Sequence, residues 1–241
     1  MRVLIAGNVL FMGFIVFIMV SGFNRNESAK KFTEIDVERI NVLGVNGKPV
    51  LVISNKRLMP GPTINGKSYA KEIVDGREFM HGLLFFNELG DEVGSLIYAG
   101  LKKDSLNYSA VGHLSMDQWH QNQVLALDYN DKSGNRYTGM RIWDRPANAS
   151  FDYMLDLLKE MKESSTNKPR YDSLLKLWNE AKEKGENGIE RLFIGSRNEV
   201  AQIQLKDKKG NIRAKLYVDE NGEAKLEFLD AKGSIVSSFP R

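Results

Sequence analysis

The residue pattern with the most defined chemistry is the glycine-rich stretch at residues 61–68. Its order of residues, Gly-Pro-Thr-Ile-Asn-Gly-Lys-Ser, matches the phosphate-binding loop of nucleotide hydrolases. In such a loop, backbone amides and a lysine hold the phosphates, and a hydroxyl binds magnesium. These roles would fall to four residues: Gly61, Gly66, Lys67 and Ser68. Asp128, at the end of an apolar run, could supply the second magnesium carboxylate.

The context of this stretch does not favour nucleotide binding. A phosphate-binding loop joins a buried parallel strand directly to a long helix. Here residues 55–60 separate the preceding apolar run from Gly61, and Gly76 limits any helix that follows. We therefore expect an ordinary Asn-Gly loop at residues 61–68, and a nucleotide hydrolase is the alternative.

A second candidate site consists of His113, Asp117 and His120, which are spaced by four and three residues. On a helix, this spacing would place all three side chains on one face, where they could bind a metal ion or exchange protons. On a strand, His113 and Asp117 would share a face and His120 would point away. Because the stretch lacks a helical apolar pattern, we expect ordinary hydrogen-bonded polar residues. A metal-dependent hydrolase is the alternative.

The composition excludes several further classes of site. The chain has 241 residues and no cysteine, which excludes thiolate metal sites, iron–sulfur clusters and cysteine nucleophiles. The formal net charge of +3 is spread along the chain, so we expect no nucleic acid as a partner. Spacing alone assembles no Ser/His/Asp set and no full calcium loop. We therefore expect no cofactor and assign no catalytic residue.

Residues 1–23 predict a membrane anchor. Residues 3–23 contain no charged side chain. As a helix they would extend about 31 Å, which is long enough to span a lipid bilayer. We expect an uncleaved transmembrane helix, and a cleaved signal peptide is the alternative. A signal-anchor at the extreme N-terminus most often leaves the C-terminal domain translocated. We therefore expect a single-pass protein of the cell membrane whose domain lies outside the cytoplasm.

Beyond a polar tether at residues 24–32, the sequence predicts a mainly β domain. Apolar and polar residues alternate over 213–218 and 224–228, as expected for strands with one wet face. Glycines recur at intervals typical of an antiparallel meander. Four Asn-Gly pairs are typical of two-residue hairpin turns, and they lie at 46–47, 65–66, 187–188 and 221–222.

The predicted strands form two regions, residues 33–149 and 187–241, and we expect these to pack together as a sandwich or a barrel-like sheet. Between them, residues 150–186 show the apolar spacing of two helices. We predict a helical hairpin there, inserted to cover an open face or edge of the sheet, with Trp178 buried.

Several segments between residues 32 and 146 resemble an uncharacterised family of bacterial membrane-anchored proteins. These segments are residues 32–42, 52–55, 82–94, 123–128 and 142–146. The resemblance implies a bacterial source and a terminal anchor followed by a β-rich domain. It implies no activity, cofactor or functional residue.

Together, these patterns lead us to expect a membrane-anchored envelope protein that acts as a non-enzymatic binding or assembly module. Exposed strand edges could pair with another copy to form a homo-oligomer, or with an envelope protein. Besides the two hydrolase alternatives, a third is a carrier whose β domain encloses a small ligand such as a lipid or a sugar.

Overall fold

The computed structural model describes Met12, residues 30–102, Asp104 and residues 106–240. Apart from Met12, the predicted anchor at residues 1–23 lies outside the described residues, as does most of the predicted tether. Among the residues that are described, no helix is both long enough and apolar enough to cross a membrane. The chain divides into two units, residues 1–37 and 38–241, and every element named below belongs to the second.

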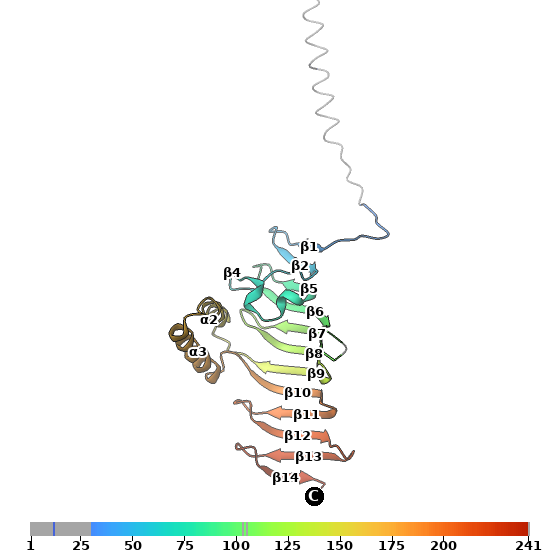
Figure 1. Cartoon of the computed structure of the whole chain (residues 1–241), viewed down its shortest axis with the longest axis vertical. Helices are drawn as coiled ribbons and strands as arrows, with labels where there is room; N and C mark the ends of the chain where they lie inside the picture. The colour runs from blue at the N-terminus through green and yellow to red at the C-terminus, as the bar shows by residue number, and fades with distance from the viewer. Residues whose placement is uncertain (1–11, 13–29, 103, 105, 241) are drawn as a thin grey trace, which may run out of the picture. The chain divides into compact units, whose positions relative to one another are not determined.

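The second unit is built on one antiparallel sheet of twelve strands, in which each strand pairs with its neighbours in chain order (Figure 1). In the order of the sheet, the strands are β1 (Arg39–Leu43), β2 (Pro49–Ser54), β5 (His81–Phe86), β6 (Glu92–Lys102), β7 (Tyr108–Asp117), β8 (Gln123–Lys132), β9 (Asn135–Asp144), β10 (Ile189–Arg197), β11 (Val200–Lys206), β12 (Ile212–Val218), β13 (Ala224–Leu229) and β14 (Ile235–Phe239). The predicted meander is therefore confirmed. The order is open, with β1 and β14 at its two ends, so the expected sandwich or barrel-like closure is not what this sheet forms.

Many turns of the meander repeat one five-residue design. In the turn from Asp230 to Ser234, the N–H of Asp230 donates to the carbonyl of Ser234, and the N–H of Gly233 donates to the carbonyl of Asp230. The Asp230 carboxylate also accepts from the N–H groups of Ser234 and Lys232, and these bonds hold its pKa below the usual value. The same backbone pattern begins at Gly44, Asn87, Asp207 and Asp219.

This design corrects part of the turn prediction. The pair Asn65-Gly66 does form a two-residue turn, with φ of +50° and +73°, between β3 (Thr63–Ile64) and β4 (Lys67–Ser68). The pairs at 46–47 and 221–222 instead occupy the third and fourth positions of five-residue turns, where only the glycine has positive φ. The pair at 187–188 follows a helix, so the hairpin prediction is wrong there as well.

The predicted helical hairpin is confirmed as α2 (Asp152–Glu163) and α3 (Lys168–Glu183), inserted between β9 and β10 (Figure 1). It packs on the β3–β4 hairpin and on the short helix η1 (Lys71–Ile73), because its buried cluster includes Ile64 of β3, Ile73 of η1 and Tyr69 from the segment between β4 and η1. Trp178 is only partly buried at the edge of that cluster, which corrects the expectation that it is fully covered.

A second small core lies on the sheet itself. Met59 and Met80, from the segment at residues 55–80, pack against Val52 of β2 and Leu84 of β5. This segment, which includes the short helix η2 (Arg77–Phe79), therefore covers one face of the N-terminal strands.

The first prediction concerns the anchoring of the helical hairpin. Leu174 is 1% exposed in the helical core, whereas Leu177 on the same helix is 42% exposed. Leu174→Ala should lower the free energy of unfolding by about 2–5 kcal/mol, through lost burial and a cavity. Leu177→Ala should cost about 1 kcal/mol or less. Urea unfolding followed by circular dichroism measures both, and equal losses would contradict this packing.

Candidate functional site

The glycine-rich stretch at residues 61–68 contains the β3–β4 hairpin, a strand–turn–strand unit in place of a loop that opens a helix. The Lys67 ammonium contacts two carboxylates on α2, with 2.8 Å from Nζ to Asp152 Oδ2 and 2.8 Å to Asp156 Oδ2. Both carboxylates raise the pKa of Lys67. The N–H of Gly66 donates to Asp91 at 3.0 Å. The Lys67 ammonium and the Gly66 N–H thus bind carboxylates of the same chain, as we expect of an ordinary loop.

The other residues of that proposed nucleotide site lie apart from these contacts. Ser68 is exposed on β4, and Gly61 packs against the backbone of Tyr69. Asp128 lies on β8, where its carboxylate contacts His113 and Arg141.

The three residues of the proposed metal site follow a strand and its turn. His113 lies within β7 and Asp117 ends that strand, while His120 lies in the following turn with φ of +51°. His113 contacts Asp128, and His120 Nδ1 lies 3.0 Å from Asp91 Oδ2. In the part of the chain that the structure describes, no group of three or more histidine, aspartate or glutamate side chains is arranged to hold a metal ion.

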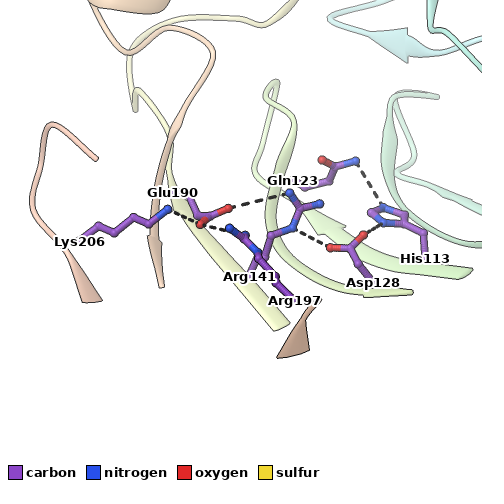
Figure 2. Close-up of polar contacts among 7 residues, drawn as sticks. All are labelled: His113, Gln123, Asp128, Arg141, Glu190, Arg197 and Lys206. Atoms are coloured by element: carbon purple, nitrogen blue, oxygen red, sulfur yellow. Dashed lines mark hydrogen bonds and ion pairs between the residues drawn. The ribbon is translucent and has the colours of Figure 1, made fainter. Parts of the chain in front are cut away.

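A chain of polar side chains, four of them charged, instead crosses five neighbouring strands (Figure 2). His113 Nδ1 lies 2.7 Å from Asp128 Oδ1, and Arg141 Nε donates to Asp128 Oδ2 at 2.8 Å. Arg141 also approaches Glu190 at 3.9 Å, and Lys206 Nζ lies 2.6 Å from the same glutamate. Because these five residues lie on five different strands, the pairing of the sheet brings the network together.

His113 is the member of this network that could move a proton. Asp128 orients its ring from one side, as a carboxylate does behind the histidine of many acid–base sites. The other ring nitrogen faces the Gln123 amide at 3.4 Å (Figure 2). His113 and Gln123 both line a cavity of about 190 Å³. The hydroxyls of Ser95 and Ser115 bond to each other at 3.1 Å. Among the described residues, these contacts therefore do not assemble a serine nucleophile with its base.

The charge state of Asp128 depends on its two partners. Burial acts to raise its pKa, but the hydrogen bonds with His113 and Arg141 outweigh burial and hold the pKa below the usual value. A carboxyl with a lowered folded-state pKa contributes its full stabilisation above the unfolded pKa of about 3.9. That contribution is lost as the pH falls through the lower, folded-state pKa.

Asp117 faces a different environment from His113. It lines a second cavity of about 120 Å³, together with Thr63 and Gln121. Burial, aided by the negative charge of Glu92, raises the pKa of Asp117 to about 7. A carboxyl of this kind changes its charge near neutral pH, which makes it a candidate for a functional site.

The face of the sheet opposite the charged network carries an unbroken apolar row, with one large side chain on every strand. Each member pairs directly with the next across the sheet. The row consists of Ile40, Ile53, Leu83, Leu96, Leu114, Leu127, Met140, Ile194, Ile203, Leu216, Leu226 and Phe239. Its exposed members include Leu127 at 48% and Leu216 at 45%.

Sequence reasoning assigned His113 and Asp128 to two different hypothetical sites and missed Arg141, Glu190 and Lys206. The signal that could have joined the first two is hairpin pairing. If the turn at residues 118–122 is placed between two strands, regular pairing puts His113 opposite Leu127, and the register shift between Met116 and Asp117 brings Asp128 there instead. The partners on β9 to β11 depend on three further registers that spacing alone does not give.

Comparison of this chain with models of known protein families and with curated proteins finds no match. The arguments below therefore rest on the geometry of the chain itself.

The second prediction separates the buried network from a surface pair. Asp128→Asn leaves Arg141 and His113 without their carboxylate in a mostly buried setting, so we expect a loss of about 2–4 kcal/mol in unfolding free energy. Asp144→Asn is the matched control, because the side chain of Asp144 is 60% exposed and also pairs with an arginine, Arg191. That change should cost about 1 kcal/mol or less.

Denaturant titrations of both variants at pH 7 and pH 3 complete this test. The deficit of Asp128→Asn relative to the parent chain should shrink at pH 3, because this pH lies below the unfolded-state pKa of about 3.9 and the parent has begun to lose the stabilisation from its Asp128 carboxylate. A deficit that stays constant with pH would contradict the role given to the Asp128 carboxylate.

Proposed function

We propose that this chain is a non-enzymatic assembly module that associates with further copies of itself through the apolar face of its sheet. The observation that supports this is the row of large apolar side chains, one on each of twelve consecutive strands. Monomeric soluble proteins rarely leave such continuous apolar surface in water.

The size of the face agrees with what a stable interface needs. Eleven strand spacings of about 4.8 Å make the row about 53 Å long, and flanking residues on the same face widen it to about 15 Å. The flat area is on the order of 800 Å², which is what each partner buries in a typical specific interface of about 1,600 Å².

The chemistry of the face favours a second copy over an anionic lipid surface. The row contains no lysine or arginine to meet lipid phosphates, whereas the opposite face carries the charged network of Arg141, Glu190 and Lys206. Two copies of one regularly spaced row can pack as facing sheets, with interdigitated side chains about 10 Å apart. Burial of the row in this way would remove the exposure of Leu127, Leu216 and their neighbours.

Membrane anchorage remains part of the proposal. The anchor predicted at residues 1–23 would hold copies in one surface and raise their effective concentration for association. The resemblance to bacterial membrane-anchored proteins supports the same arrangement, with the domain outside the cytoplasm. Association through the apolar face would then assemble the protein along the envelope.

The third prediction uses the absence of native cysteine. Leu127 lies on the sixth of the twelve strands, so the same residue of two copies meets near the middle of the row in either relative direction. Leu127→Cys in the full-length chain should give a disulfide-linked dimer as the major product of mild oxidation in membranes. Gel electrophoresis without reductant measures it.

The matched control is Lys176→Cys on α3. The Lys176 side chain is 78% exposed, so a thiol there is more accessible than one at Leu127 but lies outside the apolar face. We expect little dimer from this variant. Equal crosslinking of the two variants, or a monomeric Leu127→Cys chain, would overturn the proposed interface.

The fourth prediction concerns the side of the membrane. Protease added to intact spheroplasts should digest the domain of the full-length chain while a cytoplasmic protein is spared. Protection of the domain until lysis would contradict the translocated orientation, and it would leave the self-association test unaffected.

A further inference from the structure

A small polar cavity lies between the β3–β4 hairpin, η2, α2 and the turn from β7 to β8. It has a volume of about 120 Å³ and is enclosed in part by the apolar side chains of Phe151 and Leu155. Most of its lining residues are polar. The polar residues are Thr63, Arg77, Glu92, Asp117, Gln121, Asn122 and Gln123.

Three residues of this lining have buried oxygens without a hydrogen-bond partner among the described residues: Thr63 Oγ1, Asp117 Oδ1 and Gln121 Oε1. Gln121 is only 2% exposed, and its Nε2 donates to the carbonyl of Ala149 at 2.7 Å, which leaves the oxygen as the unpartnered end of the amide. An unpaired buried polar atom costs about 1–3 kcal/mol. All three oxygens can accept a hydrogen bond, so a ligand that supplies donors fits this lining.

The cation that lines the cavity is already engaged. Arg77 donates from Nη2 to Glu92 at 2.6 Å and from Nε to the carbonyl of Pro60 at 2.9 Å. Arg145, which interacts electrostatically with Asp117, donates to the carbonyls of Gln123 and Asn187. Neither contact set satisfies the three oxygens, which leaves them free to accept from a donor that enters the cavity.

The neighbouring cavity of about 190 Å³ has the opposite character. It shares Val74, Arg77, Glu92 and Gln123 with the polar cavity, and the rest of its lining is mostly apolar. The apolar residues are Met59, Met80, Leu84, Ile97 and Val111. The two volumes together reach the lower end of the range for small-molecule pockets, about 300–1,000 Å³.

We propose that the two cavities bind one small primary amine with a short apolar tail. An ammonium group has three N–H donors, which match the oxygens of Thr63, Asp117 and Gln121 in number and in chemistry. The tail occupies the apolar cavity, where burial of each methylene contributes about 0.8 kcal/mol. This site is distinct from the apolar face, so the inference does not rest on self-association.

The charge of Asp117 makes binding dependent on pH. The charged groups that act on it are Glu92, which raises its pKa, and Arg145 and Arg77, which lower it, while burial raises the pKa to about 7 overall. An ammonium ion binds the ionised carboxylate, so affinity should fall as Asp117 takes up a proton. Between pH 8 and pH 6, the ionised fraction drops roughly tenfold, while an alkyl ammonium, like that of lysine, stays protonated.

The experiment compares three probes on the purified full-length chain by isothermal titration at pH 8. Hexylamine should bind at least tenfold more tightly than hexanol, which lacks the charge, and than methylamine, which lacks the tail. Its affinity should fall about tenfold at pH 6. Equal affinities for hexylamine and hexanol would overturn the ammonium site, and equal affinities for hexylamine and methylamine would overturn the role of the apolar cavity.

Two variants assign the binding to the named oxygens. Asp117→Asn should remove both the preference for hexylamine over hexanol and the pH dependence, whereas Asp144→Asn should retain both. Thr63→Val removes one acceptor without changing charge, and it should weaken hexylamine binding about 3–10-fold. Circular dichroism confirms that each variant is folded. Unchanged hexylamine binding in both Asp117→Asn and Thr63→Val would overturn the proposal.

Discussion

The structure depends above all on the register of one continuous antiparallel sheet. Because side chains alternate between the two faces of a strand, a slip of one residue in any pairing would move that strand's apolar set to the wrong face. Across the eleven pairings from β1 to β14, the register keeps one large apolar residue in line on every strand. The five-residue turns maintain this register with Asp or Asn side chains and a glycine of positive φ.

The same register also builds the opposite face. Once Leu114 pairs with Leu127, His113 must pair with Asp128, and the next strands add Arg141 and Glu190. One set of backbone hydrogen bonds thus places the apolar row on one face of the sheet and the charged network and the covered pocket on the other. The segment at residues 55–80 and α2 complete the pocket on the charged side only.

The elements that depend on local chemistry could be predicted from the sequence. Alternation over 213–218 gave β12, and helical spacing gave α2 and α3. The two-residue turn at Asn198 and Glu199 could not be predicted in this way, because both residues have positive φ and neither is a glycine. The candidate site was predicted only in fragments. His113, Asp117 and Asp128 were singled out, but their partners lie on strands whose pairing depends on contacts across the whole sheet.

What the sequence determined by itself was therefore local: strand and helix periodicity, the turn positions, the absence of thiol chemistry and an apolar N-terminal segment. The tertiary structure decided that the sheet is open, that one row of apolar side chains runs its full length, and that Thr63, Asp117 and Gln121 meet in one cavity. The physical reason is that these features are relations between distant segments. They arise from the strand register and from the packing of residues 55–80 and 150–186. The spacing of residues within one short segment determines neither of these.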